Sequence, residues 1–167
     1  MDLKELSALW APWRAEYFKV GTTPDFLLAA AQTSDDTAHL VIARRKNTFL
    51  IMNRYPYAVG HMMVVPYRKV ADLSMLTDGE KLELWELAEH AQRLLSHAIK
   101  AQGFNIGLNL GECAGAGVAD HLHLHVVPRW EGDNNFMPVL ADTRILPEAL
   151  DALYQKLIAS QTALANA

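Results

Sequence analysis

Three histidines at alternate positions are the side chains of this sequence best suited to chemistry. His121, His123 and His125 lie in the segment HLHLHVVPRW, and leucine or valine follows each of them. Successive side chains of a β-strand point to opposite faces, so the imidazoles are predicted to share one face while the apolar residues anchor the row in the core. A neutral imidazole is a competent nucleophile near pH 7. The spacing therefore favours nucleophilic catalysis in which two histidines support a third.

The loop before the histidine row is built for close approach to a ligand. Residues 111–120 read GECAGAGVAD, with glycines at positions 111, 115 and 117. Glycine lets backbone N–H groups turn inward, as they do in sites that bind anions. We therefore expect this loop to contact a phosphate group, with Gly117 among the substrate-binding residues.

Two other interpretations of the histidine row stay open. The row is either a solvated strand face that happens to be rich in histidine, or a zinc site, because three histidines hold a catalytic zinc ion in some enzymes. Strict alternation beside a glycine loop argues against the first. Three side chains along one flat strand converge poorly on a tetrahedral centre, and the sequence has no Cys-x-x-Cys pair. We therefore expect no metal ligands and no tightly bound cofactor.

The bulk composition narrows the class of protein. The chain has 167 residues, of which 51% are hydrophobic and 20% charged, and its formal net charge is −4. Proteins that coat nucleic acid usually carry a broad basic surplus, so no nucleic-acid partner is expected. No apolar run approaches the roughly 18 residues of a membrane span, so no membrane partner is expected either. Cys113 is the single cysteine, which excludes an internal disulfide and fits a reducing cytoplasm.

The length and the distribution of small and polar residues predict one globular domain. The stretch GTTPDFLLAAAQTSDDT at residues 21–37 is linker-like. We therefore expect an N-terminal arm and linker over residues 1–37 and the main domain over residues 38–167.

The sheet that must hold the histidine row is predicted from apolar patterns along the chain. Runs rich in β-branched residues predict strands over 39–43, 48–53 and 61–66, and alternation predicts another over 104–110. Together with the histidine strand, these segments predict an antiparallel sheet of about five strands.

Helices are predicted on one face of this sheet. Thr77 and Glu80 form a capping box that begins a long helix, whose leucines and alanines recur at three and four residues until Gly103 closes it. Pro147 opens a C-terminal amphipathic helix. Strands in runs with helices set apart from them are typical of an α+β fold.

The segment HLHLHVV matches the motif His-φ-His-φ-His-φ-φ, and the sequence resembles the histidine triad (HIT) superfamily over roughly residues 9–160. The stretch FLIMNRYPYAVGHMMVVPYR at 49–68 is similar to the segment before that family's main helix. The stretch GFNIGLNLG at 103–111 is similar to its strand before the phosphate loop. The segments LWAPWRAEYF and PRWEGDNNF resemble the bacterial branch related to diadenosine tetraphosphate phosphorylase and hydrolase. A HIT-like fold is therefore expected.

The resemblance implies an enzyme that cleaves dinucleoside polyphosphates such as diadenosine tetraphosphate. In such an enzyme His123 attacks the α-phosphate in line and forms a nucleotidyl-histidine intermediate, which water or inorganic phosphate then releases. His121 and His125 support the reaction through hydrogen bonds and phosphate contacts. The family is usually a homodimer whose sheets meet, so we expect a homodimer with a small-molecule nucleotide as its ligand. Mg²⁺ is expected only together with the nucleotide.

The resemblance also marks further substrate-binding positions. Asn53 looks like the residue near the ribose, Asn109 like one near the phosphates, and Trp130 resembles an aromatic residue that borders the substrate. Stacking on adenine suits the indole, and amide donors suit hydroxyls and phosphate oxygens. From the residues alone, Asn53 is equally open to a turn role because Arg-Tyr-Pro follows it. His61 is interpreted as a core or strand-end histidine.

Two departures from the family pattern bear on activity. Many members carry Gln, Ser or Thr four residues before the first triad histidine, whereas this chain has Ala116-Gly117 and offers only backbone N–H groups. An adenosine phosphoramidase and a nucleotide-binding module with little turnover therefore stay open as alternatives, and the acceptor is either phosphate or water. Residues 23–27 read TPDFL where some relatives have a zinc-binding Cys-x-x-Cys, so we expect no zinc.

Overall fold

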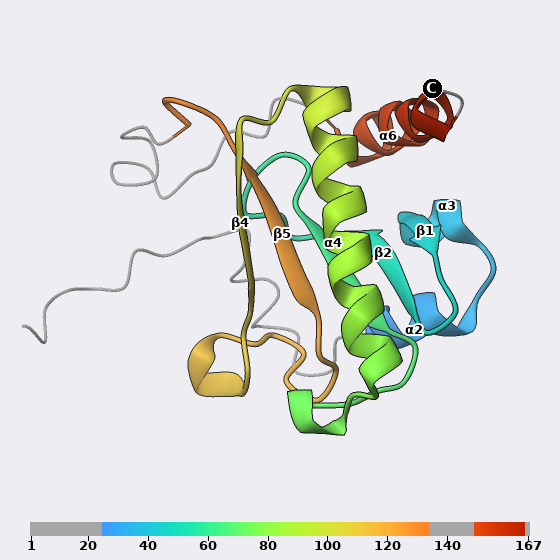
Figure 1. The fold of residues 1–167 in the computed structure, drawn as a ribbon, viewed down its shortest axis with the longest axis vertical. Helices are drawn as coiled ribbons and strands as arrows, with labels where there is room; N and C mark the ends of the chain where they lie inside the picture. Colours follow the sequence, from blue (N-terminus) through green and yellow to red (C-terminus); the bar gives the residue numbers. More distant parts are fainter. Residues whose placement is uncertain (1–24, 134–148, 166–167) are drawn as a thin grey trace, which may run out of the picture.

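The computed structural model describes residues 25–133 and 149–165, and these residues contain one five-stranded antiparallel sheet. The strands are β1 (Val41–Arg44), β2 (Thr48–Met52), β3 (Met62–Pro66), β4 (Gly103–Leu108) and β5 (Leu124–Arg129). Their order across the sheet is β1-β2-β3-β5-β4, so the last strand in sequence lies between β3 and β4. Helices pack against this sheet (Figure 1), which confirms the predicted α+β fold.

Helix α4 (Asp78–Ile99) covers one face of the sheet, and α6 (Leu150–Ala165) packs beside it. The predicted capping box is present, since the side chains of Thr77 and Glu80 each bond to the backbone of the other residue. The predicted end of α4 is three residues too late. Lys100 adopts the left-handed conformation (φ 55°) and ends the helix, so Gly103 is free to begin β4.

Alternate residues of the strands form the core under α4. The buried strand side chains on this face are Ile42, Leu50, Met52, Met62, Val64, Leu124 and Val126. The leucines and alanines of the predicted helical stripe, from Leu84 to Leu95, lie against them. Leu122 belongs to the same core, so the apolar residues of the histidine segment anchor it as predicted.

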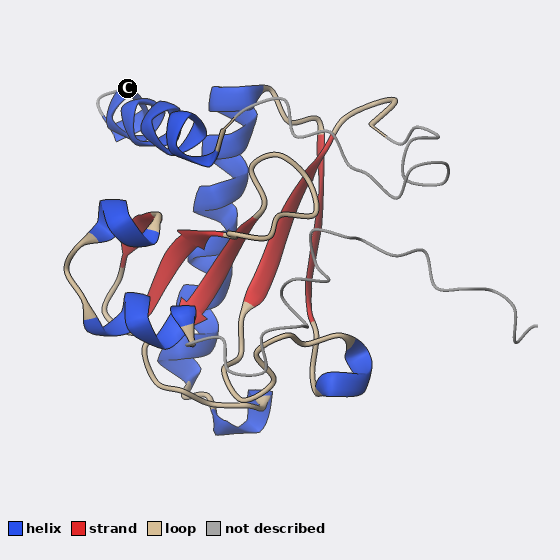
Figure 2. Ribbon diagram, turned by 180° about the vertical axis from the view of Figure 1, so that it is seen from behind, coloured by secondary structure: helices blue, strands red, loops and turns tan. Residues whose placement is uncertain are grey.

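The opposite face of the sheet carries a second, smaller core. Helix α2 (Phe26–Gln32) buries Leu27 and Ala30 against the alternate strand residues Val41, Phe49, Ile51, Met63 and Val65. Figure 2 shows the sheet from this side, away from α4. A short helix α3 (Asp36–His39) leads from α2 into β1. The segment interpreted as a linker is therefore helical in part and packed on the sheet.

Strand β5 is shorter than the sequence predicted. It begins at Leu124, so His125 lies in the ladder, whereas His121 and His123 precede it. The backbone N–H of Leu122 donates to the carbonyl oxygen of Val70 (2.7 Å), outside the sheet. This contact takes the first part of the histidine segment away from β3. Within the described residues no helix is long and apolar enough to cross a membrane.

Candidate active site

His123 is the histidine whose ring nitrogens have the clearest roles. Its Nδ1 lies 2.8 Å from the carbonyl oxygen of His121. A carbonyl oxygen only accepts, so Nδ1 carries a proton and donates it to this bond. In the neutral ring the other nitrogen, Nε2, therefore keeps its lone pair. His123 also lines a cleft, so the ring has the tautomer and the place that a nucleophile needs.

The surroundings of His123 hold its pKa below the ordinary value of 6.5. Burial is the largest cause, because the side chain is only 8% exposed and the charged form loses hydration. Positive charge on His121 acts in the same direction. The hydrogen bond to the His121 carbonyl and the carboxylate of Asp25 oppose these effects without cancelling them. The imidazole is thus uncharged near pH 7.

His125 is held by a second, buried histidine. Nε2 of His61 lies 2.9 Å from Nδ1 of His125, and His61 is 1% exposed. The pairing of β3 with β5 brings them together, because Met62 and Met63 lie opposite Val126 and His125. The register of β3 against β5 therefore brings His61 next to His125.

The direction of these hydrogen bonds follows from one backbone group. The N–H of Tyr57 can only donate, and it lies 3.1 Å from Nδ1 of His61. His61 therefore donates from Nε2 to Nδ1 of His125, which leaves His125 with its proton on Nε2. The side-chain amide of Asn109 lies 3.4 Å from that nitrogen. Because Nε2 donates, we assign the amide oxygen as the acceptor in this contact. The ring of Tyr57 stacks on His61 with centroids 4.6 Å apart.

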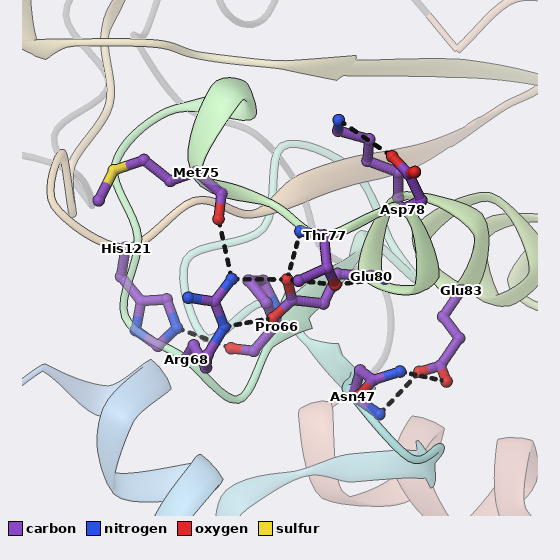
Figure 3. Close-up of polar contacts among 10 residues, drawn as sticks. Asn47, Pro66, Arg68, Met75, Thr77, Asp78, Glu80, Glu83 and His121 are labelled. Carbon is purple, nitrogen blue, oxygen red and sulfur yellow. Dashed lines mark hydrogen bonds and ion pairs between the residues drawn. The ribbon is translucent and has the colours of Figure 1, made fainter.

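His121 has a different environment from the other two triad histidines. Its ring is fully buried and does not line the cleft. Its Nε2 donates to the carbonyl oxygen of Pro66 at 2.9 Å (Figure 3). Its Nδ1 faces the carboxylate of Asp25, with Oδ2 at 3.6 Å. His121 therefore acts on His123 through its backbone carbonyl.

The cleft beside His123 and His125 has an open volume of about 400 Å³. Gly117 and Gly115 of the small-residue loop line one part of it, and the phosphate contact of Gly117 stays a prediction. The aromatic side chains that line it are Phe26, Tyr55 and Tyr57. An aromatic wall beside glycine N–H groups and imidazoles suits a nucleobase joined to phosphate.

Asn53 lies in the cleft wall and also makes a turn, so both interpretations of this residue have a structural counterpart. Its Oδ1 accepts from the N–H of Tyr55 at 2.8 Å, and its Nδ2 lies 3.3 Å from Nδ1 of His61. Both ends of its side-chain amide therefore have partners within the protein, the turn at Tyr55 and the ring of His61. Its place near a ribose stays a prediction.

Trp130 does not line the cleft and lies far from it, whereas Asn109, which is also outside the lining, contacts His125. Trp130 follows the far end of β5, about 17 Å from His125 along the strand. Its Nε1 donates to the carbonyl oxygen of Ile99 at the end of α4 (3.2 Å). Through this contact the indole packs the end of β5 against the end of α4.

Two residues of the site escaped the sequence analysis. His61 was assigned a structural role, although its position directly before a buried strand that pairs with the histidine strand is the signal that could have found it. Asp25 gave no signal, because it belongs to a segment interpreted as a linker and meets His121 only in the folded chain.

The side chains present do not fit the zinc-site interpretation. His121 Nε2 and His123 Nδ1 are both engaged as donors to backbone carbonyls. In residues 25–133 and 149–165, no three His, Cys, Asp or Glu side chains are placed to hold a metal ion. No step of the chemistry below is therefore assigned to a metal of the protein.

The fold and the histidine geometry define a class of protein. A family model for the HIT domain matches residues 34–132, more than half of the chain. The chain therefore belongs to the histidine triad (HIT) family.

Named relatives narrow the similarity. The chain is 41% identical over 155 residues to a Mycobacterium tuberculosis protein named AP-4-A phosphorylase, covering 87% of this chain and 80% of the relative. It is 33% identical over 93 residues to a Schizosaccharomyces pombe protein named bis(5'-nucleosyl)-tetraphosphatase (asymmetrical), covering 56% of this chain and 50% of the relative. A crystal structure of a zinc-bound histidine triad family protein from Mycobacterium smegmatis superposes with a TM-score of 0.63 at 25% identity, covering 76% of this chain and 86% of that one.

Proposed function

We propose that this protein cleaves dinucleoside polyphosphates, such as diadenosine tetraphosphate, at an α-phosphate through a nucleotidyl-histidine intermediate on His123. The observation that carries the proposal is the tautomer of His123, which leaves the Nε2 lone pair available beside a cleft lined by glycines and aromatic rings. The similarity to relatives named as a phosphorylase and a tetraphosphatase supports the same class of substrate.

The first chemical step forms one bond and breaks another. Nε2 of His123 attacks the α-phosphorus, an N–P bond forms, and the P–O bond to the rest of the polyphosphate breaks with its electron pair on the leaving oxygen. The ring then becomes positively charged, and the Nδ1–H bond to the His121 carbonyl stabilises that charge. This hydrogen bond therefore makes His123 a better nucleophile.

His125 is placed to assist at the phosphate. Its Nε2 carries a proton, because the N–H of His61 occupies its Nδ1. The two rings lie edge to face, 4.8 Å apart. We assign to His125 a hydrogen bond to a phosphate oxygen, while the N–H groups near Gly117 hold the neighbouring phosphates.

The acceptor that regenerates His123 is proposed to be inorganic phosphate. An oxygen of the phosphate attacks the phosphorus of the intermediate, a P–O bond forms, and the N–P bond breaks with its electron pair returning to Nε2. This releases a nucleoside diphosphate, whereas water would release a nucleoside monophosphate. The proposal follows the phosphorylase relative, which is more similar to this chain and matched over more of its length than the tetraphosphatase.

A product analysis tests both parts of this proposal. The protein is incubated with diadenosine tetraphosphate and Mg²⁺, with and without inorganic phosphate, and the nucleotides are separated. We expect ADP and ATP, formed only when phosphate is present. AMP and ATP in both tubes would show that water is the acceptor, and no product in either tube would refute the cleavage itself.

We also propose that the protein works as a cytoplasmic homodimer. Among the described strands β4 is an edge of the sheet, and its residues Asn105, Ile106 and Gly107 are exposed. An exposed edge of unpaired backbone groups is a ready site for a second copy of the same strand. The exposed thiol of Cys113 fits a reducing compartment.

A further inference from the structure

A charged cluster lies beside His121, and its side chains take no part in the reaction steps above. Nζ of Lys69 lies 2.9 Å from Oδ2 of Asp25 and 2.8 Å from Oδ2 of Asp120. The same oxygen of Asp25 lies 3.6 Å from Nδ1 of His121. The His121 side chain is fully buried and that of Asp25 is 15% exposed, so solvent screens this contact poorly.

The two nitrogens of His121 have opposite partners. Nε2 faces the Pro66 carbonyl and must carry a proton (Figure 3). Nδ1 faces a carboxylate oxygen. Nδ1 of His121 is a buried nitrogen without a hydrogen-bond partner in the part of the chain that the structure describes, whereas Oδ2 of Asp25 has the ammonium group of Lys69 at 2.9 Å.

A neutral His121 does not fit this arrangement. With its one proton on Nε2, the ring would present a bare lone pair on Nδ1 to the lone pairs of a carboxylate, inside the protein. The carboxylate already has the ammonium group of Lys69, but Nδ1 of His121 would be left unsatisfied and would face another acceptor. A second proton, on Nδ1, turns the same contact into an ion pair and removes this defect.

We propose that Asp25 holds His121 as a buried imidazolium and thereby acts as a positioning residue for the nucleophile His123. The protonation state is inferred from the geometry alone. Its consequence for catalysis rests on the proposed function.

The charges around His121 agree with this assignment. Asp25 and Asp120 carry one negative charge each and Lys69 one positive charge, so a neutral His121 leaves the cluster with one negative charge in excess. An imidazolium balances it. The neighbouring cation Arg68 does not enter the balance, because it pairs with Glu80 at 2.7 Å.

Asp25 remains ionised in this cluster. Burial alone would raise the pKa of its carboxyl, but the hydrogen bond from the N–H of Leu28, the contact with Lys69 and the charge of His121 together hold that pKa below the ordinary value of 3.8. As the N-cap of α2, Asp25 also accepts from the N–H of Leu27. The helix start thus fixes where this carboxylate lies.

An imidazolium at His121 affects His123 in two ways. Its carbonyl oxygen accepts the Nδ1 proton of His123 and so fixes the tautomer. Its positive charge opposes a second charge on His123 and keeps the nucleophile in its neutral form. The carboxylate of Asp25 also acts on His123 directly and favours its protonated form, but this effect is smaller than that of the charge on His121.

Nitrogen NMR of the histidine side chains tests the protonation state directly. At pH 8 a histidine in water is neutral, and its two ring nitrogens have well-separated shifts, whereas both nitrogens of an imidazolium have similar shifts. We expect the imidazolium pattern for His121 at pH 8 in the full-length protein. A neutral pattern there would overturn the inference, whatever the activity.

Three substitutions separate the role of Asp25 from general damage to the cluster. Asp25→Asn keeps a good N-cap for α2 but removes the charge, so we expect His121 to become neutral at pH 8. Asp25→Glu keeps the charge and is expected to restore the imidazolium pattern. Asp120→Asn makes the same chemical change on the other side of Lys69, where the carboxylate is 68% exposed and does not contact His121, so we expect it to weaken the imidazolium far less than Asp25→Asn. An imidazolium in Asp25→Asn would refute the role of Asp25.

The pH profile connects the inference to catalysis. In Asp25→Asn the ratio of kcat/KM at pH 8 to that at pH 6 is expected to rise by about threefold, because His123 gains a proton more readily when His121 is neutral. An unchanged ratio would show that His121 does not influence the nucleophile. If the wild-type protein cleaves no dinucleotide, the proposed function fails, while the NMR measurement still decides the state of His121.

Discussion

His123 combines features that a histidine nucleophile needs and that a surface histidine lacks. A backbone carbonyl fixes its proton on Nδ1, and burial keeps the ring uncharged near neutral pH. The backbone of His121 supplies this acceptor two residues away, so the alternate spacing of the motif itself sets the tautomer. The chemistry is thus encoded in the local sequence.

Replacing His123 by Asn removes the nucleophile and leaves a similar volume and a polar side chain. We expect kcat for diadenosine tetraphosphate to fall by at least about a thousandfold, with the thermal midpoint of unfolding nearly unchanged. Steady-state kinetics and a circular dichroism melt measure the two effects. Activity near the wild-type level would contradict the assignment of the nucleophile.

His61 is expected to act through His125, because it fixes the proton of that ring and does not itself line the cleft. In His61→Phe the stacking with Tyr57 is kept, but the hydrogen bond to His125 is lost. We expect kcat to fall by about 10- to 100-fold with a smaller change in KM. The same exchange at His90, which bonds to Gln161 on α6, is the control and should leave kcat unchanged.

The activity should fall on the acidic side as His123 gains a proton. Its pKa lies below 6.5, so kcat/KM should stay level as the pH falls from 8 to about 6.5 and decline only at lower pH. The unfolded chain binds this proton at higher pH than the folded chain, so the contribution of His123 to stability also falls as the pH drops below about 6.5. A pH–rate profile checks the first statement; a decline that begins near pH 8 would contradict it.

The three triad histidines and the glycine loop could be predicted from the sequence because they form one continuous segment. His61 and Asp25 could not be assigned, because each reaches the site through a long-range contact: the register of β3 against β5, and the packing of α2 on the sheet. Trp130 is a different case, and its role beside the substrate stays a prediction. It is close to the motif in sequence, but the direction of β5 carries it to the end of α4.

The elements with strong local signals were predicted well, and those that depend on packing were not. Helix α4 has 22 residues, a capping box and a continuous apolar stripe. Helix α2 has seven residues, too few for a stable isolated helix, and its stability comes from Leu27 and Ala30 on the sheet. The end of α4 at Lys100 escaped notice because a non-glycine residue takes the left-handed position.

The start of α4 should make a pH-dependent contribution to stability. Glu80 is buried, completes the capping box and pairs with Arg68, which lowers its pKa from 4.5 to about 2. We expect Glu80→Gln to reduce the free energy of unfolding at pH 7 by about 1–2 kcal/mol.

That difference should shrink as the pH falls from about 4.5 towards 2, because the folded carboxyl then takes up its proton and loses its advantage. Denaturant melts at several pH values measure it. Glu86→Gln, at an exposed position of the same helix, is the control and should show no such trend. A constant difference across this range would contradict the role of the charge.

For the whole molecule, the open edge at β4 decides the proposed assembly. Ile106 on this strand is 38% exposed. Ile106→Lys places a charge where a second copy would pair, so we expect the mass by light scattering at micromolar concentration to fall from dimer to monomer. Leu82→Lys, on the outer face of α4 where the side chain is 60% exposed, is the control. A wild-type monomer at that concentration would contradict the homodimer.

Helix α2 also determines how short a working version of this protein can be. It places Phe26 in the cleft wall and Leu27 in the core beneath. A chain trimmed to the HIT-domain match at 34–132 would keep all three triad histidines, yet it would expose Phe49, Ile51 and Met63 on a bare sheet face. Such a fragment should precipitate rather than catalyse. The smallest useful fragment therefore begins before Asp25, well outside the motif that identifies the family.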